Sequence, residues 1–554
     1  MKSIKKYILS LGVVAAALSL GSCTGDLDLM PSDPRDITAT DFASDPEGYM
    51  DQVMGQVYMA FVNHGANNNS QVAGFDGGMS TFGRALFNLE EIPTDEACWQ
   101  SSGDAGLYSL QYGNISSDND AIFGSYSRLM INVALCNDFI RTVNDNLFAL
   151  STDEQKEKAA EYVRQCKTLR SVCYFYLMSL FGNVPYADES VAIGTMAPQM
   201  KSSEIFPLVT ETLEAVVAEY GQGGQNPAYG YVGVDAAEGF LVKLYLNAEV
   251  FTGTPAWDKC LSHAKNIIAR HQGKGFKNSG LTMGYHQNFA ANNIDYVVGG
   301  KGVPEILFLL PQKYPELMSY GNSSVMILGF IAEDADKAFF NVGNGWKCAK
   351  GRPQLVNRFQ WNDQQQTTSP DKRTALWRTS KDGYVNQMPS LEQSQWNKNG
   401  YLTPKYINRN VDDNNNVDLN TQPAFNGDKY VTTNYPILRL AEIYLSAAEA
   451  ALHGAGSKDE ALTYVNLIRE RAGVAPWSLA ELTLETLQDE RSRELYLENT
   501  RRTDLIRYGK WVSGLNWAWK NNAPEGQNFA PTAVLYPLPS QVLAISPYQQ
   551  NPGY

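Results

Sequence analysis

Carboxylate and histidine side chains are the usual carriers of catalysis, and their spacing in this chain gives catalysis little support. Asp95 and Glu96 are adjacent, and neighbouring side chains of an extended segment point to opposite faces. Glycoside hydrolysis needs two carboxyl groups about 5 to 10 Å apart across one bond. Among the five histidines, which include His64, His263 and His271, none has HExxH spacing. A hydrolase is kept as an alternative, but we assign no catalytic residue and expect the protein not to be an enzyme.

Metal-ligand patterns are also missing from the sequence. The seven cysteines contain no CxxC pair, and Cys166, Cys173 and Cys260 fall on apolar faces of expected helices, where a thiol behaves as a small hydrophobe. The run 412–416 (DDNNN) resembles a calcium loop, but Val417 stands where an EF-hand needs glycine and no glutamate closes the loop. We therefore expect a solvated turn there, no disulfide framework, no metal site and no cofactor.

A dense cluster of charged residues lies near the C-terminus. It could be read as a catalytic or anion-binding site, but opposite charges three and four positions apart on a helix usually form ion pairs. The cluster is therefore predicted to organise the structure, and its members are Glu490, Arg491, Arg493, Glu494, Glu498, Arg501, Arg502, Asp504 and Arg507.

Aromatic side chains are abundant, and the chain as a whole is acidic. It contains 30 Tyr, 22 Phe and 10 Trp, and its formal net charge is -14 at pH 7. A field of this sign repels nucleic acids and other polyanions. An excess of aromatic rings suggests a binding surface, so the composition favours a neutral ligand and no nucleic-acid partner.

Helical periodicity dominates the elements that must position these residues. Apolar residues spaced three and four apart mark one face of an amphipathic helix, and Ile122, Tyr126, Leu129 and Val133 form the first such stripe. The same spacing predicts further helices over Val163–Leu180, Ile205–Val216, Phe240–Ala248, Trp257–Ile268, Leu440–Ala451 and Ala461–Ile468.

Helix ends and small residues indicate how these helices are joined. Residues 151–154 (STDE) have the form of a capping box, residues 457–460 (SKDE) cap a second helix, and Gly182 and Gly454 follow helix ends. Alanines at helix contacts and short glycine-containing turns are typical of tetratricopeptide-like repeats, although no strict 34-residue consensus is present. We therefore predict a mainly α fold, a divergent tetratricopeptide-like helical repeat scaffold.

Between residues 272 and 434 the composition changes to Asn, Gly, Gln and Trp, and helical periodicity weakens, which indicates a loop-rich surface subdomain. The predicted organisation is a helical part over 46–271, a loop-rich ligand-binding insertion over 272–434 and a C-terminal helical part over 435–554. Trp477 and Trp257 lie near helix starts and are expected to be packing residues.

The N-terminus reads as an export signal. Three lysines precede an apolar run over Tyr7–Leu20, which is shorter than the roughly 20 residues of a membrane-spanning helix and ends in small residues before Cys23. This pattern resembles a bacterial lipobox, so residues 1–22 are expected to be removed and Cys23 to be lipidated, with residues 23–45 as a tether. The alternative is an ordinary cleaved signal peptide with an incidental cysteine.

Five separated stretches resemble the SusD/RagB family of surface lipoproteins, and the likeness spans nearly the whole chain. In chain order they are Phe87–Glu96, Leu180–Pro185, Arg439–Leu445, the segment from Glu490 to Gly509, and Tyr536–Pro539 with Gln550–Tyr554. One departure is Asn499, where the family commonly has glycine. Asparagine tolerates the left-handed backbone conformation, so we expect the turn to be kept.

The resemblance implies a SusD-like fold and a non-catalytic role at the cell outer membrane, facing the exterior. Such proteins bind polysaccharide or peptides and deliver them to a TonB-dependent (SusC-like) transporter for nutrient uptake. The chain most resembles the starch-binding members, which implies starch or another α-glucan (maltooligosaccharides) as ligand. Another neutral glycan, or peptides, is the alternative within the family.

The resemblance also implies the site residues. The positions that match the family's aromatic arc are Trp99, Tyr320 and Trp346, and those that match its polar contacts are Asp76 and Arg84. An asparagine of the starch-binding members falls near Ser102, so one hydrogen bond differs. Two alternatives stay open: Trp99 could plug a core, and Asp76 and Arg84 could pair with each other.

Overall fold

The structure is a computed structural model of the chain. It describes residues 39–63, 78–101, 103–221, 226, 229–297, 302–331, 334–360, 369–378, 400–426 and 429–554. The signal segment, Cys23 and most of the tether lie outside the described residues, as do His64, Asp76 and Ser102. The chain divides into two compact units: unit 1 comprises Met1–Gly55 and Thr142–Tyr162, and unit 2 comprises Gln56–Arg141 and Val163–Tyr554.

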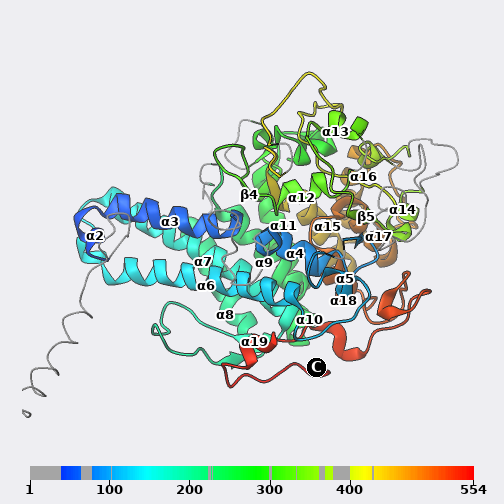
Figure 1. Ribbon diagram of the computed structural model, residues 1–554. Coiled ribbons are helices and arrows are strands. Elements are labelled where there is room, and N and C mark those ends of the chain that lie inside the picture. The colour runs from blue at the N-terminus through cyan, green and yellow to red at the C-terminus, as the bar shows by residue number, and fades with distance from the viewer. Residues whose placement is uncertain are drawn as a thin grey trace, which may run out of the picture. The chain divides into compact units, whose positions relative to one another are not determined.

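Helices dominate the regular structure, as the sequence predicts (Figure 1). The α-helices are α2 (Ala39–Ser44), α3 (Pro46–Val62), α4 (Phe82–Glu90), α5 (Leu107–Gln111), α6 (Asp120–Asp145), α7 (Asp153–Phe181), α8 (Ser202–Tyr220), α9 (Val234–Leu246), α10 (Ala248–Thr252), α11 (Trp257–His271), α12 (Ser323–Leu328), α13 (Asp334–Phe340), α14 (Pro353–Arg358), α15 (Leu440–Ala450), α16 (Lys458–Arg471), α17 (Leu484–Leu495), α18 (Arg501–Arg507) and α19 (Ser540–Leu543).

Short elements connect these helices. The 3-10 turns are η2 (Gly78–Ser80), η3 (Leu147–Ala149), η4 (Phe276–Asn278), η5 (Tyr285–Phe289), η6 (Asn293–Tyr296), η7 (Lys372–Thr374), η10 (Lys520–Asn522) and η11 (Pro531–Val534), and η9 (Ala451–Ala455) is a π turn. The strands are β1 (Ala97–Trp99), β2 (Val184–Pro185), β3 (Gln199–Met200), β4 (Ile306–Leu310), β5 (Ala349–Gly351) and β6 (Tyr435–Arg439). They form the antiparallel pairs β1–β5, β2–β3 and β4–β6.

The helix ends follow from local sequence, with one correction. Ser457 Oγ accepts a hydrogen bond from the Glu460 N–H (3.1 Å), as its capping pattern predicts. The capping box predicted at 151–154 is wrong by one residue, because Thr152 Oγ1 caps the Gln155 N–H (3.2 Å) and Gln155 Oε1 accepts from the Thr152 N–H (3.3 Å). Glutamine completes the box as well as glutamate does.

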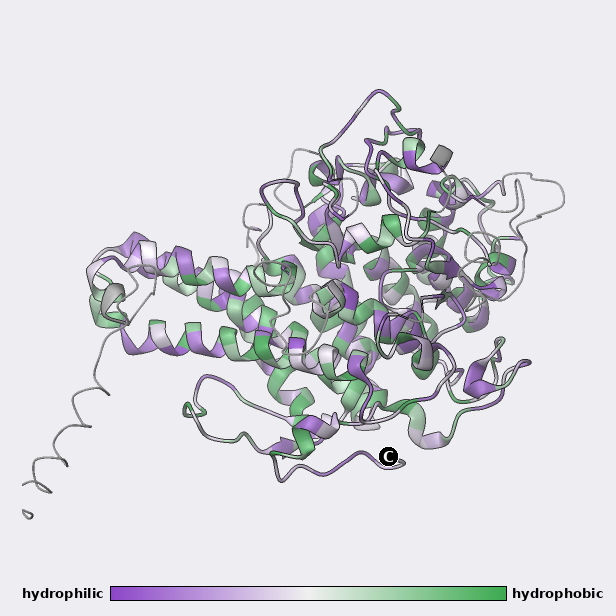
Figure 2. Cartoon of the chain, in the orientation of Figure 1, coloured by the Kyte–Doolittle hydropathy of each residue, from purple (hydrophilic) through white to green (hydrophobic). Residues whose placement is uncertain are grey.

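The repeat-like core of unit 2 is a succession of packed helices. Helix α9 packs against α8 and α11, α11 packs against α15, and α15 packs against α16. Their contact faces are apolar, and in Figure 2 hydrophobic and hydrophilic residues alternate along the helices. Gly239 on α9 allows a close approach, because a Cβ there would lie 2.3 Å from Leu438 Cδ2. The predicted mainly α, tetratricopeptide-like fold is confirmed.

The charged cluster of α17 and α18 is largely buried and forms ion pairs, which confirms that it organises the structure. Most of its partners, however, lie on other elements. Arg491 Nε lies 2.7 Å from Asp504 Oδ2, and Arg501 Nε lies 2.7 Å from Asp95 Oδ1. Glu494 accepts from Arg439, which precedes α15 (3.2 Å). Only some pairs follow the predicted spacing, because the helices cross and bring distant residues together.

The predictions for the cysteines, for the turn at 412–416 and for Asn499 also agree with the structure. Cys98, Cys136, Cys166, Cys173, Cys260 and Cys348 are free and buried. Asp412 Oδ1 accepts from the N–H groups of Asn414 (2.9 Å) and Asn416 (2.8 Å), which closes the predicted turn. Asn499 has a φ of 61°, the left-handed conformation expected for it. Across the described ranges, no helix combines the length and hydropathy that membrane crossing requires.

Candidate functional site

Four of the predicted site residues meet around one cavity of about 510 Å³ in unit 2. Arg84 comes from α4, Trp99 from the end of β1, Tyr320 from the loop before α12, and Trp346 from the loop before β5. The β1–β5 pair joins two of these segments, since Trp99 lies opposite Ala349. Residues more than 200 positions apart in the sequence therefore form one wall.

Trp99 and Arg84 form the buried floor of this cavity. Trp99 is only 2% exposed, and its indole N–H donates to Asp104 Oδ2 (2.7 Å). The Arg84 guanidinium lies 4.1 Å from the Trp99 ring centroid, and its Nε donates to Asn88 Oδ1 (2.7 Å). A ring that is this deeply buried, with the Arg84 guanidinium over it, has no open face for stacking.

Tyr320 is half-buried and held by a close backbone contact. A Cβ at Gly78 would lie 2.0 Å from the Tyr320 ring, so only glycine at position 78 leaves room for it. The Tyr320 loop is fixed to the start of α4, because Asn322 Oδ1 accepts from the Gly83 N–H (3.2 Å) and Asn322 Nδ2 donates to Ser319 Oγ (3.2 Å). The ring therefore faces the cavity from a fixed position.

Trp346 is also half-buried and lies in a tightly bonded turn. Its N–H donates to the Leu328 carbonyl (2.6 Å), and the next N–H, of Lys347, donates to the Ile331 carbonyl (3.2 Å). Asn344 Oδ1 accepts from the Gly345 N–H (2.9 Å), and Lys347 has a φ of 62°. This turn presents a large ring at the cavity without burying it.

Sequence reasoning missed several residues of this cavity. Asp104 follows Trp99 by five positions, and Asn344 precedes Trp346 by two, so both could have been suspected from proximity. Lys429 carries no such signal, yet its Nζ lies 5.7 Å from the Tyr320 ring centroid. Beside it, Tyr430 contacts Tyr320 edge to face (centroids 6.4 Å apart).

The carboxylates considered for hydrolysis are not on this cavity. Asp95 and Glu96 are buried, and they do not diverge as expected of an extended segment. Both face Arg501, whose Nε lies 2.7 Å from Asp95 Oδ1 and 3.4 Å from Glu96 Oε1. The pKa of Asp95 is held well below its usual range because Arg358 and Arg501 outweigh the effect of burial. Of the described residues that line the cavity, Asp104 is the carboxylate.

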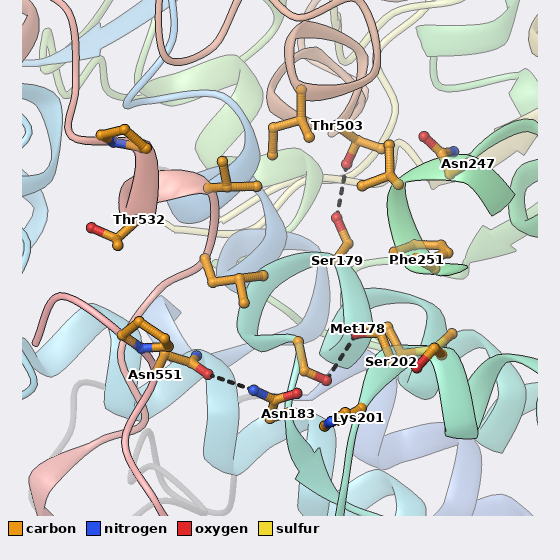
Figure 3. Close-up of a pocket in the computed structure, with 18 residues that line it drawn as sticks. Met178, Ser179, Asn183, Lys201, Ser202, Asn247, Phe251, Thr503, Thr532 and Asn551 are labelled. Atoms are coloured by element: carbon orange, nitrogen blue, oxygen red, sulfur yellow. Dashed lines mark hydrogen bonds between the residues drawn. The ribbon is translucent and has the colours of Figure 1, made fainter. Parts of the chain in front are cut away.

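A second cavity of about 440 Å³ has a different character (Figure 3). Aliphatic side chains and Phe251 form much of its lining, and its polar groups bond one another: Ser179 Oγ and Thr503 Oγ1 lie 3.1 Å apart, and Asn183 Nδ2 donates to Asn551 Oδ1 (3.4 Å). It brings none of the predicted site residues together, so the aromatic cavity is the candidate site.

Comparisons with known proteins find relatives that are similar in sequence and in fold. Residues 358–554 match the SusD family. The solved structures with similar folds include a SusD superfamily protein from Bacteroides thetaiotaomicron, with a TM-score of 0.67, 17% identity and coverage of 93% of this chain and 100% of that one. The resemblance to the SusD/RagB family is thereby confirmed.

Particular relatives are similar over most of their length. Starch-binding protein SusD from Bacteroides thetaiotaomicron is 26% identical over 590 aligned residues, covering 99% of both chains. SusD-like protein P2 from Formosa agariphila is 25% identical, over 78% of this chain and 79% of its own. Surface glycan-binding protein A from Bacteroides thetaiotaomicron, solved in complex with laminarihexaose, shares the fold with a TM-score of 0.64 at 18% identity, over 91% of this chain and 99% of that one.

Proposed function

We propose that this protein is a glycan-binding lipoprotein of the cell surface that holds a neutral oligosaccharide in the aromatic cavity. The observation that carries the proposal is the convergence of Arg84, Trp99, Tyr320 and Trp346 on one cavity of about 510 Å³. A neutral sugar offers apolar C–H faces and polar hydroxyls, so it needs rings for the faces and charged or amide groups for the hydroxyls.

The side chains divide this work between them. Tyr320 and Trp346 supply the stacking surfaces, each contributing about 0.5 to 1.5 kcal/mol beyond area burial, if aromatic pairs are a guide. Trp99 packs against the Arg84 guanidinium and does not stack on the sugar. This revises the role that the resemblance implies for Trp99. Arg84 and Lys429 donate to hydroxyls, and Asp104 and Asn344 can accept from them. Such a site binds its ligand reversibly, as a protein that passes its ligand onward must.

Starch or another α-glucan is the ligand we favour. The relative aligned over 99% of both chains is named for binding starch, and the predicted site positions converge here as one wall. The solved complex with laminarihexaose supports the alternative, because a related fold holds a different glucan. Asp76 and Ser102 stay predicted contacts and lie outside the described residues.

We also propose where the protein acts and which protein receives its ligand. Lipidation at Cys23 would hold the protein at the outer membrane, and a TonB-dependent transporter would receive the glycan. Support comes from the lipobox-like sequence and from the likeness to SusD over the whole chain.

Affinity electrophoresis tests ligand identity. Native gels containing amylopectin, laminarin, a fructan or no polysaccharide are run with the wild-type protein. Retardation by amylopectin is expected. Retardation only by laminarin or the fructan would keep the glycan-binding role and overturn the α-glucan assignment, while equal migration in all gels would overturn both.

The rival function, glycoside hydrolysis, has less support, because the described lining residues supply one carboxylate and that one accepts the Trp99 N–H. The discriminating assay measures reducing ends released from each polysaccharide during prolonged incubation. No release is expected, and sustained release that disappears in an Asp104→Asn variant would favour hydrolysis instead.

A further inference from the structure

A third cavity, of about 430 Å³, lies beside α14, the end of α16 and the start of α17, apart from the aromatic cavity described above. Its lining includes Trp477, which sequence reasoning assigned to packing, together with Arg358, Arg469 and Arg493. An indole and three guanidinium groups therefore surround one hollow outside the candidate site.

Trp477 is half-buried and rigidly held. Its N–H donates to Asn466 Oδ1 (2.7 Å), and its carbonyl accepts from Asn466 Nδ2 (2.9 Å), so both backbone groups are fixed by one side chain of α16. The Arg469 guanidinium lies 4.2 Å from the ring centroid, and Arg469 is in turn bonded to the Ala475 carbonyl (2.7 Å). The ring therefore lines the cavity in a defined orientation.

Arg358 gives the cavity an unsatisfied donor. Its side chain is 9% exposed, and its Nη1 is buried with no hydrogen-bond partner among the described residues. Its other nitrogens are used: Nε donates to Asp489 Oδ1 (3.1 Å), and Nη2 donates to Asp95. A buried donor without an acceptor is unfavourable. Because Nη1 is closed off in this structure, a small turn of the guanidinium would bring it to a ligand oxygen in the cavity that its residue lines.

The charges around the cavity indicate whether the ligand oxygen belongs to a neutral or to an anionic group. Glu490 Oε2 lies 2.7 Å from both Arg469 Nη1 and Arg493 Nη2, and Asp489 and Asp95 balance Arg358. The side chain of Asp489 is 47% exposed and would repel an anion. Glu490 is shared with Arg373 and Asp95 with Arg501, but Asp371 and Asp489 both line the cavity. Their charges oppose an anion, which favours a neutral hydroxyl over a carboxylate, sulfate or phosphate.

We propose that this cavity is a second carbohydrate subsite, in which a sugar ring packs on Trp477 and one of its hydroxyls accepts a hydrogen bond from Arg358 Nη1. The ligand class rests on the proposed function, since both cavities would take the same neutral glycan. Polysaccharide held at two points would bind more tightly than a hexasaccharide held at one, because the second contact becomes intramolecular.

Fluorine NMR of the full mature chain labelled with 5-fluorotryptophan tests the proposal. The Trp477 and Trp346 resonances are assigned with the variants Trp477→Phe and Trp346→Phe, and maltohexaose and laminarihexaose are titrated separately. For the hexasaccharide that binds, the Trp477 resonance is expected to shift saturably, with a midpoint different from that of Trp346, and to keep shifting in Trp346→Phe protein.

The outcomes separate the two proposals. A Trp346 shift with Trp477 unmoved overturns the second subsite and leaves the proposed function standing. A Trp477 shift with Trp346 unmoved supports the second subsite and overturns the aromatic cavity as the main site. Loss of the Trp477 shift in Trp346→Phe protein shows that it was relayed from the first site and overturns the subsite, and no shift at either ring with either sugar overturns both.

Arg358→Lys is the matched variant, because it keeps the charge beside Asp95 and Asp489 but removes the forked donor. We expect the sugar concentration at the Trp477 midpoint to rise about threefold to tenfold, which is the effect of losing one net hydrogen bond. The Trp346 midpoint should stay unchanged. An unchanged Trp346 midpoint also shows that the variant is folded. An unchanged Trp477 midpoint would overturn the role of Arg358.

Discussion

At the scale of single residues, the site depends on how rings are held rather than on how many there are. Tyr320 and Trp346 are half-buried, whereas Trp99 is almost completely buried with Arg84 over its ring. The position of Tyr320 depends on a residue with no side chain, Gly78, against which the ring packs. Binding should therefore respond to changes that touch no ligand directly.

Gly78→Ala tests this dependence. The new methyl group would lie 2.0 Å from the Tyr320 ring, so the ring must move away from its place in the wall. If stacking on Tyr320 contributes about 1 kcal/mol, glycan affinity should fall about fivefold. Isothermal titration with the hexasaccharide that the protein binds measures the change.

Gly55→Ala is the control, because a Cβ at that position in α3 has no neighbour within 4 Å. It should leave affinity unchanged and raise helix stability by about 0.5 to 1 kcal/mol. Unchanged affinity in Gly78→Ala would mean that Tyr320 does not need its observed position.

Sequence alone could predict part of the site at this scale. Trp346 lies in a Gly-Asn-Gly-Trp turn, a context in which an aromatic ring is often presented to a ligand, and it is half-buried at the cavity. The burial of Trp99 could not be predicted, because it depends on Arg84 and on a strand partner 250 positions away. Lys429 and Tyr430 were missed for the same reason: only the folded loops bring them to Tyr320.

At the scale of elements, the cavity depends on the short β1–β5 pair. Arg352, directly after β5, ties it down from a buried position: its Nε donates to the Ala97 carbonyl (2.9 Å) and its Nη1 to the Ala518 carbonyl (2.9 Å). Its own N–H donates to the Glu96 carbonyl (2.9 Å). One side chain thus joins β1 to β5 and to the C-terminal segment.

Arg352→Met should therefore lower both stability and affinity. Hydrogen bonds from a charged donor contribute about 1.5 to 3 kcal/mol each, so a loss of about 3 kcal/mol in the free energy of unfolding is expected from urea denaturation. Glycan affinity should fall in parallel because β1 carries the cavity floor.

Ser457→Ala provides the contrast, since it removes the N-cap of α16, which contributes no residue to the aromatic cavity. It should cost about 1 kcal/mol of stability and leave affinity unchanged. If Ser457→Ala weakened binding as Arg352→Met does, general destabilisation rather than loss of β1 would be the cause.

Helices were predictable from the sequence because their apolar spacing and caps are local signals, as α15 and α16 show. The capping box before α7 was misplaced by one residue, since neighbouring polar residues offer two registers. The partners of the charged cluster were less predictable: Arg439 and Arg471 reach Glu494 from other elements, and sequence spacing does not encode such contacts.

At the scale of the whole molecule, a buried ionic network links the C-terminal helices to β4 and β6. Glu305, next to β4, accepts from Arg439 Nη1 (2.8 Å) and Arg471 Nη1 (2.7 Å). These two guanidinium groups outweigh burial and lower the pKa of Glu305 to about 2. The pKa values of Glu490, Glu498 and Asp504 are lowered by arginine neighbours in the same way.

Stability should accordingly fall in acid. A carboxyl group whose pKa is lower in the folded state stabilises the protein above its unfolded pKa of about 4.5, and this contribution is lost as pH falls toward the folded value. For Glu305 the loss approaches about 3 kcal/mol between pH 5 and pH 2. Burial raises the pKa of Glu90 and Glu91, which offsets part of the effect. Urea denaturation at pH 6, 4.5 and 3 measures the dependence.

Glu305→Gln separates this network from the other carboxyl groups. The variant should be less stable at pH 6, because Arg439 and Arg471 lose a charged partner, and its stability should change less between pH 5 and pH 3. An identical pH dependence in the two proteins would show that Glu305 does not carry the acid sensitivity.

The central claim is that Tyr320 and Trp346 hold a neutral glycan in one cavity, and calorimetric titration of the double variant Tyr320→Ala/Trp346→Ala tests it most directly. Wild-type protein should bind maltohexaose reversibly, and the double variant, with an unchanged urea midpoint, should lose the binding isotherm of the aromatic cavity and keep at most the heat of the Trp477 cavity. Binding by the double variant with wild-type affinity would contradict the account, because the glycan would then be held elsewhere.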